Sequence, residues 1–115
     1  MIFAHIRVTA PGSRRPEIVK ALRSVIGPTR LEHGCMACDL LEEIDNPGVL
    51  HLVARWQTQQ DLEDHLRSAR YARLLAIAEV SAEPPVIAFH WVTLTKGLSY
   101  LAQVRLGGSV LCEEG

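Results

Sequence analysis

Residues 49–66 read VLHLVARWQTQQDLEDHL, and this run predicts a strand that passes directly into a helix. In its first half, over 49–57, apolar residues occupy alternate positions, the period of a strand with one buried face. Thr58 is typical of a helix N-cap, and Asp61 suits the positive end of the helix that follows. One face of that helix carries Leu62, His65 and Leu66.

The flanking sequence predicts further strands and helices on both sides. Pro47-Gly48 suits a type II turn that joins the strand over 49–57 to an earlier one as a hairpin. Gly27-Pro28 is expected to interrupt the first helix, with a further turn over 29–33 as an addition to it. The other predicted elements, in chain order, are a strand over 2–9, a helix with Pro16 in its first turn, a strand over 35–44, a helical stripe of Tyr71, Leu74, Leu75 and Ala78, and a strand over 86–95.

This order is βαββαβ and predicts an α+β, ferredoxin-like fold, with helices on one face of an antiparallel sheet. The second face is then bare. Phe3 and Val53 fall on that face, with either Phe89 and Trp91 or their strand neighbours. A contiguous apolar patch of this kind usually marks an interface, so we expect a homodimer that forms face to face.

Residues 97–115 exceed what the βαββαβ unit in residues 1–96 requires. Apolar residues alternate from Leu98 to Leu106, and Gly107-Gly108 follows them. The pattern predicts a small extra hairpin, with a frayed helix as the alternative. We expect this C-terminal extension to act as an arm that reaches over the partner subunit.

The composition is that of one globular domain. Hydrophobic residues make up 48% of the 115 residues and charged residues 22%, with a formal net charge of −1. Such a balance favours neither nucleic acid nor an anionic membrane as partner. No targeting or membrane-spanning segment is recognisable, and three cysteines indicate reduced thiols, so a cytoplasmic protein is expected.

Two groups of residues invite a metal or redox interpretation. Cys35 and Cys38 form a Cys-x-x-Cys pair, but no second pair completes a zinc site, and in a regular strand the two thiols would point to opposite faces. The five histidines show no recurring ligand spacing. We therefore expect buried structural thiols and no bound metal.

His65 is the candidate catalytic residue that the pattern itself offers. It lies on the inward side of its helix, where a neutral imidazole can accept a proton from a bound acid. Tyr71 places a hydroxyl on an apolar stripe and needs a partner if it is buried. The chain has no glycine-rich phosphate loop, nucleophile elbow or dinucleotide fingerprint, so nothing implies NAD, FAD or ATP.

Two motifs together resemble the antibiotic biosynthesis monooxygenase family. The first is the run 28–35, which ends in Glu-x-Gly-Cys, and the second is Trp56 followed by Leu-x-x-His-Leu-x-Ser over 62–68. The resemblance extends over residues 1–96 and implies a dimeric α+β barrel. It also implies oxidation of quinols, phenols or anthrone-like polyketides by O2 without metal, flavin or haem. In this resemblance Trp56 matches a strand-end tryptophan that lines the pocket, and His65 matches a helix histidine.

The chain departs from the family pattern at several positions. Ala54 stands where many relatives have Glu, and Arg70 where many have His. Leu52 and Leu62 replace polar side chains of the polyketide-oxidising members, which implies a more apolar pocket. Leu75 occupies the position of the axial histidine in the haem-degrading branch, so haem is not expected.

The resulting expectation is a cofactor-independent monooxygenase for a small aromatic quinol, phenol or polyketide-like substrate. His65 would act as base or orienting group, and the substrate would contact Trp56, Tyr71, Leu52 and Leu62. Two alternatives stay open: a non-catalytic dimeric module that binds an apolar small molecule, and a redox or isomerase role in catabolism, since this fold hosts several chemistries.

Overall fold

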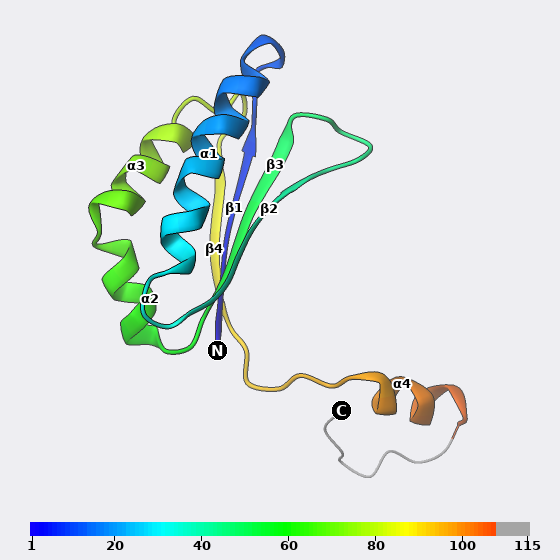
Figure 1. The fold of residues 1–115 in the computed structure, drawn as a ribbon. Coiled ribbons are helices and arrows are strands. Elements are labelled where there is room, and N and C mark those ends of the chain that lie inside the picture. The colour runs from blue at the N-terminus through cyan, green and yellow to red at the C-terminus, as the bar shows by residue number, and fades with distance from the viewer. Residues whose placement is uncertain (108–115) are drawn as a thin grey trace.

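The computed structural model describes residues 1–107, which form a four-stranded antiparallel sheet with three helices on one face (Figure 1). The elements are β1 (Ile2–Thr9), a 3-10 turn (Gly12–Arg14), α1 (Arg15–Arg30), β2 (Cys35–Glu42), β3 (Val49–Trp56), α2 (Gln59–Leu66), α3 (Ala69–Ala78), β4 (Val86–Trp91) and α4 (Leu98–Arg105). The strand order is β2-β3-β1-β4, with all neighbours antiparallel. The predicted ferredoxin-like βαββαβ fold is therefore confirmed.

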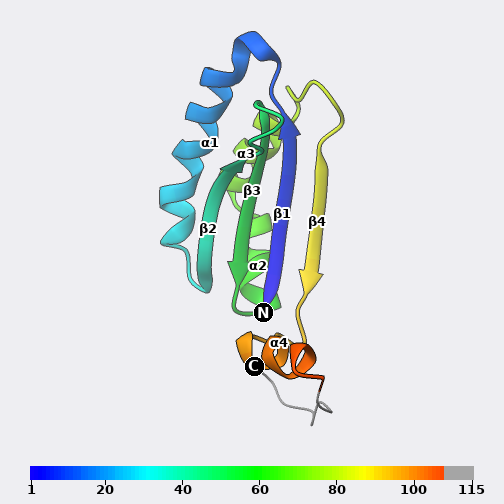
Figure 2. The same ribbon diagram turned by 90° about the vertical axis from the view of Figure 1, so that its right-hand side faces the viewer.

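The core lies between the sheet and the helices α1, α2 and α3. Figure 2 shows these helices behind the sheet, whose other face is turned to the viewer and carries none of the described helices. Alternation within each strand sends one set of side chains into this core, as the sequence pattern predicts. The most deeply buried side chains are Trp56, Leu22, Leu50, Leu62, Leu74, Thr29 and Cys38.

The bare face of the sheet is more polar than we expected. Phe89 lies opposite Ala4, so it points to the helix side, and its strand neighbours Ala88 and His90 belong to the bare face. Phe3 and His5 on β1 are partly buried there. The bare face therefore mixes apolar residues with histidines and arginines.

Helix α1 continues through Gly27-Pro28 to Arg30, so the predicted interruption is wrong. Proline removes one backbone donor and disfavours the interior of a helix. Here Pro28 lies in the last turn, where the loss is confined to a single hydrogen bond. The buried Thr29 holds this turn, because its hydroxyl donates to the carbonyl of Val25 at 2.7 Å.

A β-bulge in β2 changes the expected placement of the cysteines. Cys35 pairs with Trp56 and Cys38 with Ala54, and the register shifts between them. The extra residue moves both thiols to the helix-covered face, so the expectation that they point to opposite faces is wrong. Both cysteines are free, with Cys38 buried and Cys35 half-buried.

Hydrogen bonds connect the turn after α1 to the start of α2. The Thr58 hydroxyl accepts a hydrogen bond from the Asp61 amide at 3.1 Å, which confirms the predicted N-cap. The Asp61 carboxylate accepts a further hydrogen bond from His33 at 2.8 Å. Gly34 adopts a positive φ of 80°, and a Cβ at this position would collide with Asp61. These contacts bring the end of α1 close to α2.

The C-terminal extension begins as a helix. Residues Leu98–Arg105 form α4, and no strand pairing occurs there, so the predicted hairpin is wrong over this range and its helical alternative is found. The alternating pattern was ambiguous, because Leu98, Leu101 and Val104 also share helical spacing. The predicted second half of the hairpin, over 109–112, lies outside the described residues.

Candidate functional site

A cavity lies between the sheet and α1, α2 and α3. Its enclosed room is about 20 Å³, although the hollow and its opening to solvent together span about 350 Å³. That room suffices for about one water molecule, so an aromatic ligand enters only if lining side chains move apart. The lining residues are Ala4, Ile6, Thr29, Cys38, Leu52, Ala54, Trp56, His65, Tyr71, Leu74 and Phe89.

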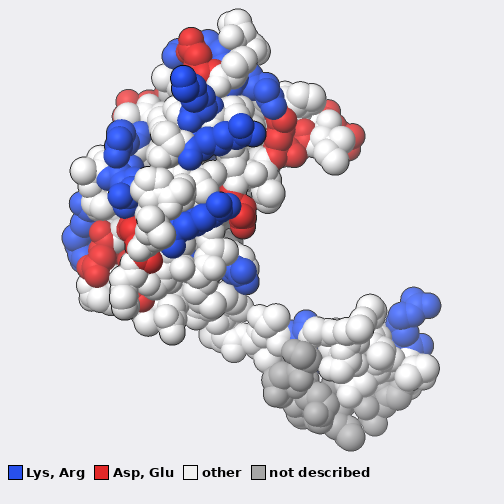
Figure 3. Space-filling view, viewed as in Figure 1, with Lys and Arg blue, Asp and Glu red and all other residues white. Residues whose placement is uncertain are grey.

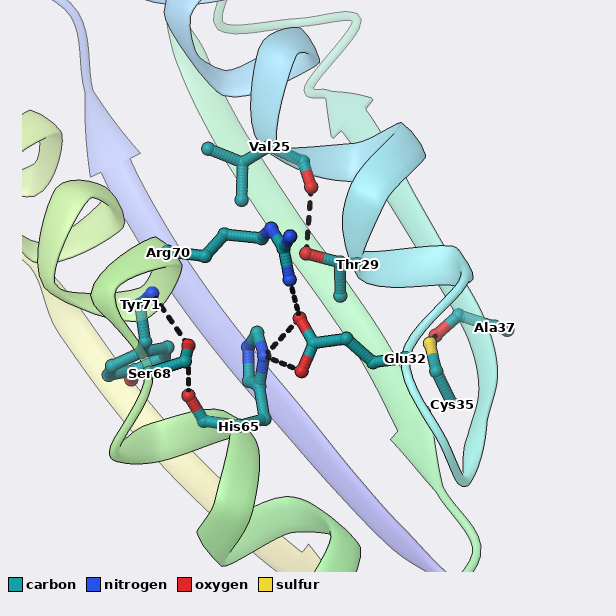
Figure 4. A network of polar contacts seen from close by, with 9 residues as sticks. All are labelled: Val25, Thr29, Glu32, Cys35, Ala37, His65, Ser68, Arg70 and Tyr71. Carbon is teal, nitrogen blue, oxygen red and sulfur yellow. Dashed lines mark hydrogen bonds and ion pairs between the residues drawn. The ribbon is translucent and has the colours of Figure 1, made fainter.

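His65 stands at the polar end of this cavity, paired with Glu32. Figure 4 shows the Glu32 carboxylate directed at the imidazole, and Nδ1 of His65 lies 3.0 Å from each carboxylate oxygen. An ionised carboxylate can only accept, so the proton of a neutral His65 resides on Nδ1. The other ring nitrogen, Nε2, then carries a lone pair that can accept a proton.

Arg70 completes the polar end of the site. Its guanidinium, on α3, forms an ion pair with the same Glu32 carboxylate, which therefore lies between His65 and Arg70 (Figure 4). The side chains are 20% exposed for Glu32 and 29% for Arg70. A carboxylate held by a cation on one side and an imidazole on the other fixes the orientation of the histidine ring.

Sequence reasoning did not find this Glu32–Arg70 pair. It treated Arg70 only as a departure from the family pattern, and Glu32 only as part of the Glu-x-Gly-Cys motif. The two residues are 38 positions apart and meet because α1 ends beside the α2–α3 junction. Glu32 and His65 lie in the two family motifs, and their common presence was the one available signal.

Two aromatic rings enclose the imidazole of His65. The Trp56 ring centroid lies 4.6 Å from that of His65, and the Tyr71 ring meets it edge-on at 5.2 Å. Trp56 is fully buried, and its indole N–H finds no hydrogen-bond partner among the described residues. Burial raises the pKa of Tyr71 above its usual value, so this phenol stays protonated. The site thus offers an unused indole donor beside a lone pair on His65.

The predicted leucines occupy different environments. Leu52 and Ala54 both line the cavity, so one of its walls is apolar. The sequence led us to expect this wall to lack polar side chains. Leu62 is buried in the core but does not line the cavity. Leu75 is 38% exposed and is not among the lining residues.

Cys35 and Cys38 are expected to be weakly reactive thiols. Burial raises the pKa of Cys38 to about 12, and burial also raises the pKa of Cys35. A thiol with a raised pKa is a weak nucleophile at neutral pH. Within residues 1–107, no cluster of three or more His, Cys, Asp or Glu side chains is arranged to hold a metal ion.

A second polar network lies on the bare face of the sheet, away from the cavity. His5 Nε2 lies 2.8 Å from His51 Nδ1 with the rings stacked, and His51 Nε2 lies 2.8 Å from the Glu43 carboxylate. Burial, and then the neighbouring charge of His51, lower the pKa of His5.

In the described part of the chain, no helix combines the length and apolar character needed to cross a membrane.

Comparison with known proteins points in one direction. The family model described as antibiotic biosynthesis monooxygenase matches residues 1–77. The Mycobacterium tuberculosis protein named "Putative monooxygenase Rv0793" is 33% identical over 87 residues, which covers 71% of this chain and 85% of that protein.

The solved structure of Rv0793 superposes with a TM-score of 0.71 at 26% identity and covers 79% of this chain and 93% of that chain. The structure of PA3566 from Pseudomonas aeruginosa superposes with a TM-score of 0.69 at 20% identity and covers 79% and 92%, which shows the shared fold.

Proposed function

The chain belongs to the antibiotic biosynthesis monooxygenase family, and on that premise we propose that it oxidises a small aromatic quinol or phenol with O2 in the cavity beside His65. The observation that carries the proposal is the Glu32–His65 pair at the end of an apolar cavity. A base oriented by a carboxylate, next to a mostly apolar pocket, is what deprotonation of a bound phenol requires.

The proposed reaction begins with the transfer of the phenolic proton to Nε2 of His65. The resulting phenolate is electron-rich enough to pass one electron to O2, and recombination of the two radicals forms a carbon–oxygen bond. The peroxide formed takes the proton back from the imidazolium of His65. Loss of water, whose second hydrogen comes from the carbon that carries the peroxide, then places one oxygen atom in the product as a carbonyl and the other in water. Glu32 stabilises the imidazolium that forms in the first step, and the indole N–H of Trp56 donates to the developing phenolate.

The cavity composition also favours a particular substrate class. Leu52, Ala54 and Phe89 present apolar surface, and the unpaired indole N–H belongs to Trp56, whose ring lies beside His65. A planar aromatic molecule with one or two hydroxyl groups at one edge matches this distribution, because its ring buries apolar surface and its hydroxyl meets the base. A charged group placed against the apolar wall would be a buried charge without a partner.

We also propose that the protein is a homodimer that packs through the bare faces of its two sheets. Partly buried Phe3 and Val53 lie on this face, and no helix within residues 1–107 covers it. Light scattering should give twice the mass of the 12.7 kDa chain. A monomer at all concentrations tested would refute the dimer.

The test of the proposed activity is O2 uptake by the purified, metal-free protein with hydroquinones, naphthohydroquinones and anthrones, corrected for autoxidation. We expect His65→Gln to lower the enzyme-dependent rate by about 10²- to 10⁴-fold, the range for loss of a general base. The matched control is His33→Gln, because the His33 side chain is 93% exposed and lies outside the cavity. Binding of these compounds without any uptake would instead support a non-catalytic binding module, for which the apolar Leu52 wall is the favouring observation.

A further inference from the structure

Helix α4 stands apart from the rest of the described chain. After β4 ends at Trp91, the chain runs away from the sheet, and α4 lies beside none of its helices or strands (Figure 1). Its large apolar side chains are open to solvent, with exposed fractions of 78% for Leu98, 50% for Leu101 and 51% for Val104. Leu106, at the end of the helix, is 84% exposed.

An isolated helix of this kind is not stable in water. Helices shorter than about 12 residues are marginal alone, because nucleation is unfavourable and few hydrogen bonds follow it. Helix α4 has eight residues and no N-terminal side-chain cap. Its stability must therefore come from burial of its apolar side chains against another surface.

The position of α4 indicates what covers it. Both α4 and the β2–β3 turn project from the side of the bare sheet face, so the molecule is C-shaped, with this face at the base of the hollow (Figures 1 and 3). A body seated on the bare face would lie directly beside α4. The surface that needs a partner and the helix that needs burial are therefore continuous.

The size of the bare face favours a second copy that brings its own arm. Four strands about 4.8 Å apart and about eight residues long give a projected area of roughly 500 Å². Stable interfaces bury about 800 Å² on each partner. Two exchanged helices, one from each protomer, would supply apolar contact area that the sheet faces alone do not.

We propose that α4 is an exchanged arm: in the homodimer, each protomer's α4 packs its apolar side chains on the body of the second copy. This inference rests on the dimer proposed above. It assigns a role to residues 98–105, which lie outside the region matched by the family model.

The test combines a dilution series with hydrogen exchange on the full-length chain. Leu98→Ser/Leu101→Ser should raise the dimer dissociation constant tenfold or more. The matched control is Leu31→Ser, since Leu31 is 88% exposed at the end of α1 on the helix side, and it should leave the constant unchanged. In the wild-type dimer, the amides of residues 101–105 should exchange slowly and lose protection on dilution to monomer.

The outcomes separate the two proposals. A wild-type protein that is monomeric at every concentration refutes the dimer itself. A stable dimer whose α4 amides exchange freely, and whose dissociation constant the double substitution does not change, refutes the arm alone. Protection of α4 that persists in the monomer also overturns the arm, because the helix would then be covered by its own chain.

Discussion

Replacement of Glu32 by glutamine is expected to lower the free energy of unfolding by about 2 kcal/mol. The carboxylate accepts from His65 Nδ1 at 3.0 Å and pairs with Arg70, and hydrogen bonds to charged groups contribute about 1.5–3 kcal/mol each. The side chains of Glu32 and Arg70 are one-fifth to about one-third exposed, so solvent screening keeps the sum well below that of a buried pair. Arg70 depends strongly on this partner, because its Nη1 contacts Glu32 and its buried Nε makes no hydrogen bond in the described chain.

Urea denaturation at one fixed protein concentration measures this change, since dimerisation makes stability concentration-dependent. The matched control is Glu63→Gln, whose ion pair with Arg67 spans 3.5 Å on an exposed helix surface and should matter by less than about 0.5 kcal/mol. A double-mutant cycle with Arg70→Gln then isolates the coupling between the two side chains.

Nitrogen NMR of the His65 ring provides an independent readout. In the neutral form of the ring, the wild-type protein should carry the proton on Nδ1, which faces Glu32. Glu32→Gln should weaken that tautomer preference, because an amide can donate as well as accept. If Glu32→Gln costs no more than Glu63→Gln and leaves the tautomer unchanged, the carboxylate does not orient the base, and this reasoning is wrong.

Three further predictions concern the rest of the fold. The free energy of unfolding should fall as the pH drops from 7 to below 6.5, because folding lowers the pKa of His5 and the unfolded state takes up the proton first. In denaturation experiments at several pH values, His5→Gln should flatten this pH dependence. An unchanged slope in the variant would contradict the prediction. Cys38 should resist alkylation at pH 8 in peptide mass spectrometry of the folded protein, since its pKa is about 12, and rapid labelling would show that the strand opens. Gly34→Ala should destabilise the protein by about 2 kcal/mol in thermal or urea unfolding, because the new Cβ would collide with Asp61 and the backbone φ at this position is positive. In the control Gly12→Ala the new Cβ points into open space, so the stability should change little.

The fold could be predicted because its signals are local. Alternation over 49–56, the N-cap at Thr58 and the turn at Pro47-Gly48 each depend on a few adjacent residues, and each is present in the structure. The errors arose where packing overrides local preference. Buried Thr29 holds α1 together beyond Pro28, and a bulge that no residue pattern announces moves Cys35 and Cys38 to one face.

The candidate site could be predicted only in part. His65, Trp56 and Tyr71 face one cavity because strand and helix periodicity places them inward, and that periodicity is visible in the sequence. The link from His65 through Glu32 to Arg70 depends on how the end of α1 sits against α2 and α3. Contacts between distant segments leave no local signature, so only the structure brings these three residues together.

The most direct test of the monooxygenase proposal is mass spectrometry of the product formed under ¹⁸O2, with the quinol or anthrone that gives the fastest enzyme-dependent O2 uptake. We predict one ¹⁸O atom in each product molecule, with this product absent in His65→Gln and present in His33→Gln. A product that carries oxygen from water alone, or O2 uptake that yields only the two-electron oxidised quinone and peroxide, would contradict the proposal.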